Sequence, residues 1–530
     1  MLRKLLLILM TAVMTSAFAS QLPFKYRLRF VDKAGSYELL EQPHQLLSSR
    51  ALERRTRNRV EVDTTDLPVS AIYMEKLRGA GFHIVSSSRW MNSVVVESDK
   101  EGQELIFKLL PFVKDAKLVW KSNGTQPSMF VEESYEENVV IKDARRQLEI
   151  HNGQKLHEAG YRGEGMLIAV IDGGFLNTDL ISMINQNVVG YRDFADPDSD
   201  FYLTHPHGTM VLSTMASNDS GTLPGSAPNA NYWLLRSEDS SSEFPVEEDY
   251  WIAAAEYADS LGVDIINSSL GYFMFDDPSM DYTWEDLDGK TAFITQGANM
   301  AASKGMLVVN SAGNERNKYW ERISFPADSP DILTLGAINP YKKIASFSGA
   351  GFTGPFVKPD VMAVGDPAYL CSTDGVVRTG TGTSFSSPVM AGLLACLWQA
   401  LPQLTSREMI ALARECSDRF ATPDSLYGYG IPDLYEALSR YPTPLPALTE
   451  DSRYTFQPFD TSGYIWSLAG LPYERYRIEI FNFAGQMMDK RDFKGSGYIL
   501  NLNNLPTGLY IVNLQSDKIN CSQRINIDRK

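Results

Sequence analysis

Ser384 is the residue whose surroundings point most clearly to chemistry. It follows the Thr381-Gly382-Thr383 segment and precedes an apolar run, residues 389–395, which predicts a buried helix. A serine at a helix N-terminus lies among free N–H groups and at the positive end of the helix dipole, where developing negative charge is stabilised. Ser384 can therefore be a nucleophile, or it can simply cap the helix, as serine often does.

A nucleophilic serine needs a base, and the usual base is histidine. The chain has only six histidines. His207 is followed by Gly208-Thr209 and by a run of small and apolar residues to position 216, which predicts a histidine at the start of a tightly packed helix. His205 precedes Pro206 and lacks this context, so we expect an ordinary surface-loop residue there.

Two strand-like segments end in polar residues that could complete such a site. Residues 166–171 form a continuous apolar run, typical of a central parallel strand, and end in Asp172. An acid at the carboxyl end of such a strand lies where α/β sheets build their sites, although it could also be a turn aspartate before two glycines. Residues 305–310 form a similar run that leads to Asn314, whose amide could bind an oxyanion or simply belong to a loop.

The order Asp172, His207, Asn314, Ser384 resembles that of the subtilisin-like serine proteases, the subtilases. The resemblance covers roughly residues 150–440 and implies an α/β fold, a three-layer arrangement with a mostly parallel central sheet. It rests on five blocks in the family's order, residues 168–174, 207–209, 267–271, 311–315 and 382–388.

The resemblance implies a role for each of the four residues. Ser384 would attack the scissile carbonyl, and His207 would take its proton and pass it to the leaving amine. Asp172 would hold the imidazole in the right tautomer. The Asn314 amide and the Ser384 backbone N–H would bind the oxyanion. The protein would then be an endopeptidase acting on polypeptides through an acyl-enzyme; the alternative is an inactive subtilisin-like adhesin or binding protein.

The resemblance implies substrate binding for two short segments of the same domain, residues 269–271 and 312–313. The first would pair with the substrate backbone, and both would form the walls of the primary specificity pocket. Glu315 could lie at the floor of that pocket, and the acidic segment 275–290 could shape or cover the cleft. The residues concerned are Ser269, Leu270, Gly271, Ala312 and Gly313.

The N-terminus predicts export from the cytoplasm. A basic pair at positions 3–4, an apolar run at 5–14 and the small-residue pattern at 17–19 are typical of a cleaved signal peptide, residues 1–19. The run is shorter than the roughly 20 residues that a membrane anchor needs. No other segment predicts a transmembrane helix.

Residues 20–135 resemble a subtilase propeptide, because strand-like and helix-like segments follow one another as βαββαβ, with the second helix expected over 100–110. The resemblance implies a ferredoxin-like α+β domain that blocks the active site until it is cleaved, and thus a zymogen. Cleavage is expected within 120–145. An insertion, residues 32–68, carries the basic run 50–59, for which we expect a solvated helix rather than a nucleic-acid site.

The peptidase domain, residues 136–440, is followed by a proline-rich linker, 441–450, and a C-terminal domain, 451–530. Alternating segments at 475–482, 498–502, 509–514 and 524–527 predict a small all-β sandwich. It resembles the sorting domain of type IX secretion substrates, and the match is best at 508–512. The resemblance implies that the type IX secretion machinery is a partner and that the protein is secreted or lies on the cell surface. The alternative is an accessory β-sandwich module.

Composition and local patterns bear on nucleic-acid binding, on disulfides and on metal or cofactor requirements. A net charge of -16 argues against nucleic-acid partners. Of the four cysteines, Cys371 is expected in a loop and Cys396 and Cys416 in helices, either free or paired. The chemistry requires no cofactor. Structural calcium is common in the family, but the acids at 196, 198 and 200 and at 281, 286 and 288 complete no calcium-loop pattern, and we expect solvated loops.

Overall fold

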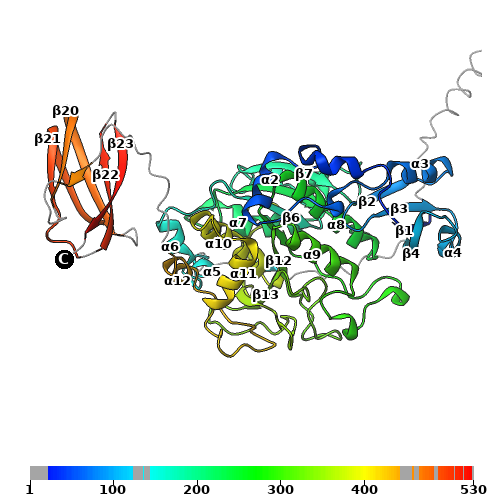
Figure 1. Ribbon diagram of the computed structural model, residues 1–530. Helices are drawn as coiled ribbons and strands as arrows, with labels where there is room; N and C mark the ends of the chain where they lie inside the picture. Colours follow the sequence, from blue (N-terminus) through cyan, green and yellow to red (C-terminus); the bar gives the residue numbers. More distant parts are fainter. Residues whose placement is uncertain are drawn as a thin grey trace, which may run out of the picture.

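The computed structural model describes residues 22–122, 135–136, 144–441, 456–458, 465–482, 487–506, 508–516 and 519–527 (Figure 1). The predicted signal peptide, the linker beyond Tyr441 and most of the segment expected to be cleaved lie outside these residues. The described part forms an N-terminal α+β region, a large α/β region and a C-terminal all-β region, each with a hydrophobic core.

The α/β region is built on a seven-stranded sheet in which every pair of neighbours is parallel. The strand order is β16-β13-β12-β11-β6-β10-β7. The strands are β6 (Leu167–Asp172), β7 (Val188–Asp193), β10 (Asn231–Arg236), β11 (Ile265–Ser268), β12 (Leu307–Ser311), β13 (Leu333–Ile338) and β16 (Val361–Val364).

Helices cover both faces of this sheet. Within β6, Ile168 and Val170 face one core and Ala169 and Ile171 the other, so the unbroken apolar run reflects burial on both sides. The three-layer prediction is confirmed. One layer contains α7 (His207–Ala216), α10 (Thr383–Ala400), α6 (Gly153–Glu158), α11 (Ser406–Glu415) and α12 (Leu434–Ser439), with α5 (Arg146–Glu149) beside them; the other contains α8 (Val246–Leu261) and α9 (Phe293–Ser303).

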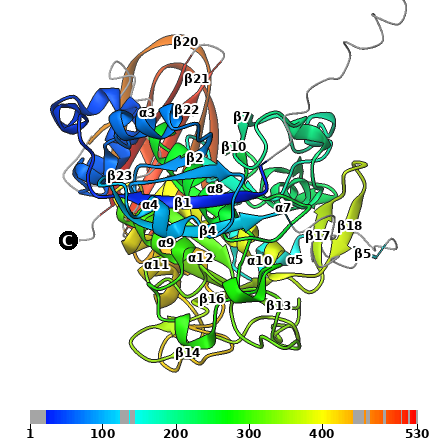
Figure 2. The same cartoon turned by 90° about the vertical axis from the view of Figure 1, so that its right-hand side faces the viewer.

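The N-terminal region has a four-stranded antiparallel sheet in the order β2-β3-β1-β4, backed by helices. Its elements are β1 (Phe24–Phe30), α3 (Ala71–Gly79), β2 (Ile84–Ser88), β3 (Ser93–Ser98), α4 (Glu104–Phe107) and β4 (Val113–Lys121), as the βαββαβ prediction requires. The helix expected over 100–110 shrinks to α4, because Gly102 adopts φ 70° before it and Pro111 follows. In Figure 2 this sheet lies over α8 and α9.

The insertion in this region contradicts the sequence-based expectation. It forms α2 (Ser49–Arg57) with short 3-10 turns at Tyr37–Glu41, Pro43–Gln45 and Thr64–Asp66. The expected helix is present, but the prediction that it is solvated is wrong, since Arg54 and Arg55 are buried against Asp259 of α8. The acid that pairs with them lies some 200 residues further along the chain, so a local basic pattern could not reveal it.

The C-terminal region is all-β, as predicted, and its strands pair antiparallel around their own core. Its strands are β19 (Gln457–Pro458), β20 (Ile465–Asn482), β21 (Met487–Asn501), β22 (Gly508–Gln515) and β23 (Asn520–Ile527). The first long strand begins ten residues earlier than predicted, because Gly470 and Pro472 interrupt the alternation where the pairing with β21 shifts its register.

Minor elements complete the described chain. Short strand pairs are β8 (Asn218–Asp219) with β9 (Leu223–Pro224), β14 (Phe352–Thr353) with β15 (Val357–Lys358), and β17 (Ala368–Cys371) with β18 (Val377–Gly380), the last also pairing with β5 (Tyr135–Glu136). Further 3-10 turns lie at Thr178–Leu180, Phe201–Leu203, Pro278–Met280 and Trp284–Asp286.

All four cysteines are free and buried, which decides between the two alternatives left open by the sequence. Cys371 ends strand β17 instead of lying in a loop, because the segment before Ser384 folds into a hairpin. In the part of the chain that the structure describes, every helix is too short or too polar to cross a bilayer.

Candidate active site

Asp172 and His207 are brought together at the carboxyl end of the sheet. Asp172 is the last residue of β6 and His207 the first of α7, as the apolar patterns predicted. His207 Nδ1 lies 2.6 Å from Asp172 Oδ1, which also accepts the Gly173 N–H at 2.8 Å. Asp172 is fully buried and His207 nearly so, so the carboxylate can fix the tautomer and orientation of the ring.

Gly208 explains how α7 can start so close to the aspartate. Its N–H donates to the Gly174 carbonyl at 2.9 Å, and a Cβ at position 208 would collide with that oxygen and touch Asp172. A side chain here would push His207 away from its partner. The glycine after the histidine is therefore a requirement of close backbone approach.

Ser384 lies in the first turn of α10, where Gly382 occupies the N-cap position, so the capping role predicted as the alternative falls to the glycine. The Ser384 carbonyl accepts a hydrogen bond from the Ser269 hydroxyl at 2.8 Å, which connects the start of α10 to the residue that follows β11. The ring of the next residue, Phe385, lies 6.2 Å from the His207 ring, centre to centre. The serine thus reaches the edge of the sheet that carries His207.

Asn314 is oriented by the residue that precedes Ser384. Its side-chain Oδ1 accepts hydrogen bonds from the Thr383 N–H and the Thr383 hydroxyl, both at 2.9 Å. The same hydroxyl accepts the Gly313 N–H at 3.1 Å. With Oδ1 held in this way, Nδ2 is the end of the carboxamide left to donate to a developing oxyanion.

The two segments expected to bind substrate meet at Ser324. A Cβ on Gly271 would overlap the Ser324 hydroxyl, and one on Gly313 would lie 2.8 Å from it. Ser324 Oγ is buried, and no hydrogen-bond partner for it is found among the described residues. Sequence reasoning missed this serine, because no local pattern distinguishes it from an ordinary loop serine.

Glu315 has a charged partner within its own loop. Its carboxylate pairs with Lys318 Nζ at 3.0 Å, three residues further along the chain. The ion pair directs the acid along its own loop, so no role in the pocket floor follows from its position.

His205 is closer to the site than expected for an ordinary loop residue. Its Nδ1 accepts the His207 backbone N–H at 3.4 Å, and the two ring centres are 6.4 Å apart. Burial lowers the pKa of His205 to about 4. The side chain is therefore neutral near pH 7 and adds no charge beside His207.

Three acidic side chains gather beside the site, at positions the sequence did not single out. Glu238, Glu243 and Glu247 have carboxylate oxygens within 4.8 Å of one another, the one such group among the described residues. Burial raises the pKa of Glu238 to about 7, although Tyr272 and Ser237 donate hydrogen bonds to it. The two acidic runs considered for calcium do not form such a group.

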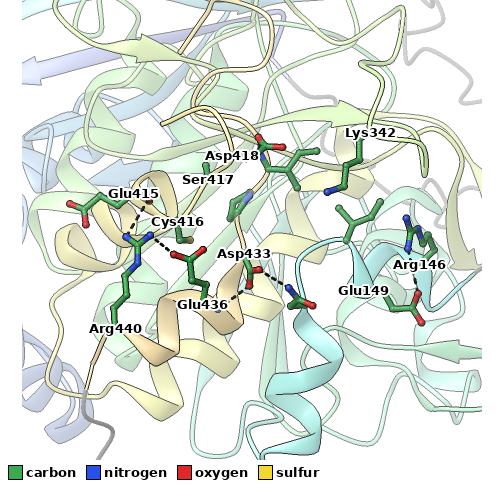
Figure 3. A pocket seen from close by; sticks show the side chains of 14 residues that line it. Arg146, Glu149, Lys342, Glu415, Cys416, Ser417, Asp418, Asp433, Glu436 and Arg440 are labelled. Carbon is green, nitrogen blue, oxygen red and sulfur yellow. Dashed lines mark hydrogen bonds and ion pairs between the residues drawn. The ribbon is translucent and has the colours of Figure 1, made fainter. Parts of the chain in front are cut away.

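A separate polar hollow of about 460 Å³ lies among α5, α11 and α12 and contains no triad residue (Figure 3). Some of its charged groups have partners: Arg440 pairs with Glu436 at 2.7 Å, and Asp433 accepts the Asn152 amide at 2.6 Å. Because the described residues that line the hollow include no histidine and only one serine, Ser417, it offers no serine–histidine pair and is no competing candidate for the active site.

This fold and this site define a serine peptidase of the α/β class, and comparison with known proteins places the chain more narrowly. Residues 163–430 match the Subtilase family, so the chain belongs to that family. Residues 25–133 match the Peptidase S8 propeptide domain of Bacteroidota, and residues 465–528 match the Secretion system C-terminal sorting domain. The protein is a subtilisin-like serine endopeptidase with a propeptide.

Individual relatives agree with this placement. The chain is 30% identical to subtilisin DY of Bacillus licheniformis over 259 residues, 48% of this chain and 84% of that protein. It is 31% identical to subtilisin E of Bacillus subtilis over 257 residues, 48% of this chain and 61% of that protein. The crystal structure of the epidermin leader peptide processing serine protease of Staphylococcus aureus shares the fold, with a TM-score of 0.54, 17% identity and coverage of 79% of this chain and 98% of that one.

Proposed function

We propose that this protein is a secreted serine endopeptidase, made as a zymogen, that uses Asp172, His207 and Ser384 to hydrolyse peptide bonds. The observation that carries the proposal is the 2.6 Å contact between His207 Nδ1 and Asp172 Oδ1 at the sheet edge where α10 presents Ser384. The contact leaves Nε2 as the ring nitrogen that can accept a proton.

The reaction follows from these positions. Ser384 Oγ attacks the scissile carbonyl while His207 takes its proton, and the charged ring is stabilised by Asp172. The oxyanion accepts hydrogen bonds from Asn314 Nδ2 and the Ser384 backbone N–H. His207 then protonates the leaving amine, which gives an acyl-enzyme on Ser384. A water molecule, deprotonated by His207, hydrolyses that ester and restores the serine.

The zymogen proposal rests on where the propeptide meets the peptidase domain. Trp120 donates to the Ser242 hydroxyl at 3.2 Å, and Lys121 pairs with Asp277 of the acidic 275–290 segment at 2.7 Å. After the intervening segment, β5 pairs with β18, which ends four residues before Ser384. We place the processing cut between Ser122 and Tyr135, inside the interval expected from the sequence.

Export is proposed from the C-terminal region. A match to a secretion sorting domain, together with the predicted signal peptide, supports passage through the periplasm and then the type IX machinery to the cell surface or beyond. Polypeptides on the outside of the cell would be the substrates.

The decisive experiment is labelling with a fluorophosphonate probe. The mature protein should be labelled on Ser384, and Ser384→Ala should abolish labelling and leave the propeptide attached. Labelling that persists in the alanine variant would sink the assignment of the nucleophile. Propeptide loss from purified Ser384→Ala protein would instead overturn self-processing.

A further inference from the structure

The propeptide insertion, residues 32–68, contacts the peptidase domain far from the triad; we call it the clamp. The triad residues Asp172 and His207 lie at the carboxyl end of the sheet strands. Helix α8 starts after β10 and ends before the amino end of β11, and its 16 residues span roughly 24 Å. Contacts with the end of α8 are therefore at the opposite edge of the sheet from the triad.

The centre of the clamp is a pair of buried arginines on α2. Arg54 pairs with Asp259 and donates to the Val263 carbonyl at 2.6 Å. Arg55 bridges the other oxygen of Asp259 at 2.7 Å and Asp66 of the clamp at 2.8 Å. All four charged side chains are at most 2% exposed, so each depends on its partners and not on water for compensation.

A second set of contacts surrounds this centre. Arg57 pairs with Asp264 at 2.6 Å, and Arg50 donates to the Gly262 carbonyl at 3.0 Å and also pairs with Asp264. From the peptidase side, Lys304 at the end of α9 reaches Asp66 at 3.2 Å. Each side of the interface thus contributes both basic and acidic side chains, which makes the contact selective for a partner with the complementary arrangement of charges.

The clamp also reaches the other helical layer. Asn58 Oδ1 accepts the backbone N–H of Ser406, the first residue of α11, at 2.7 Å. A Cβ on Gly305 would lie 2.7 Å from Asn58 Cβ, so α2 approaches the backbone there as closely as glycine permits. Because α8 and α9 cover one face of the sheet and α11 packs with the helices of the other, the clamp connects both layers.

We propose that the clamp is a second binding site that keeps the excised propeptide on the processed enzyme, and that its partner surface around Asp259, Asp264 and Lys304 recognises an arginine-rich helix. The proposal takes from the proposed function only that a cut falls between Ser122 and Tyr135. Each contact named above between the clamp and the peptidase domain joins a described residue before that cut to a described residue after it. Separation requires the buried arginines and Asp259 to give up their partners together, which is costly.

The test uses the full chain with Ser384→Ala and a recognition sequence for an added site-specific protease between Ser122 and Tyr135. After complete cutting, the two fragments should elute together from a size-exclusion column. The dissociation rate is then measured by diluting the complex that carries a fluorescently labelled propeptide and recording the release of the label. Arg54→Gln with Arg55→Gln should speed dissociation at least about a hundredfold. The exposed control Arg78→Gln, which pairs only with Glu75 three residues away among the described residues, should leave it unchanged.

If the double variant fails to fold, Arg50→Gln with Arg57→Gln serves instead, because these side chains are 42% and 30% exposed. That variant should speed dissociation about tenfold. Immediate separation of the unmodified fragments, or equal dissociation rates for clamp and control variants, would overturn the proposal. Since no step needs catalysis, a failure of the proposed protease activity would not affect the result.

Discussion

Asn314 Oδ1 accepts both the backbone N–H and the hydroxyl of Thr383, each at 2.9 Å. The residue before the proposed nucleophile thereby sets the direction of the proposed oxyanion donor. Ser384 lies in α10 and Asn314 in the loop that follows β12, and Thr383 couples their positions. This coupling yields a prediction that separates positioning from direct participation in the chemistry.

Thr383→Val keeps the backbone bond and removes the hydroxyl bond. We expect kcat to fall about tenfold with KM little changed, since a hydrogen bond that contributes about 1.4 kcal/mol to the orientation of Asn314 is lost. Asn314→Ala should lower kcat about a hundredfold to a thousandfold. Steady-state kinetics on a peptide substrate would measure both. If Thr383 acts through Asn314, adding Thr383→Val to Asn314→Ala causes no further loss; an undiminished tenfold effect would contradict this role.

Asp172→Asn should leave the fold intact and lower kcat about ten-thousandfold, because an amide at this position favours the wrong imidazole tautomer. KM should change little, since the side chain is buried beneath the ring and away from a bound peptide. A thermal melt serves as the control for folding. Retention of more than a tenth of the activity would show that the 2.6 Å contact does not orient the base.

Gly271→Ala should lower both stability and kcat/KM, because the new Cβ would overlap the Ser324 hydroxyl. Overpacking of this kind costs about 1–3 kcal/mol. The second substitution Ser324→Gly removes the obstructing atoms and should restore most of the loss. Gly354→Ala is the matched control, since a Cβ there would contact nothing within 4 Å. No rescue by Ser324→Gly would mean that Gly271 is needed for another reason.

The Glu238 carboxyl predicts a pH dependence of stability. Burial raises its pKa in the folded protein to about 7 from an ordinary value of 4.5. The folded state therefore holds this proton more tightly than the unfolded state, so the contribution of this group to stability is complete below pH 4.5 and is lost as pH rises through 7. The contribution is on the order of 3 kcal/mol.

Glu238→Gln should flatten this fall, with Tm measured between pH 4.5 and 7 in the presence of a chelator so that bound cations do not contribute. Glu158→Gln, at an exposed position on α6, is the control and should follow the unsubstituted protein. The neighbouring Glu243 and Glu247 also have raised pKa values through burial, so a residual slope is expected. An unchanged slope would show that Glu238 is not the group that titrates.

The sequence by itself determined the α/β class, the order of the three regions and the four residues of the proposed site. Asp172 ends an apolar run typical of a strand buried on both faces, and His207 and Ser384 each precede a run of small and apolar residues typical of a packed helix. The order of these residues and Asn314 then resembles that of the subtilases. Local patterns also located the propeptide strands and the all-β C-terminal region, with errors at α4 and β20, where glycine and proline obscure the boundaries.

Only the tertiary structure decided the contacts between residues far apart in the chain. Arg54 and Arg55 lack any local sign of burial, because Asp259, the acid that neutralises them, is supplied by a different domain. Ser324 gains its significance from two glycines on other loops, and Glu238 from two further acids that fold against it. Residue types and periodicity report the backbone around a position, whereas electrostatic compensation and steric fit depend on partners that only the folded chain brings within reach.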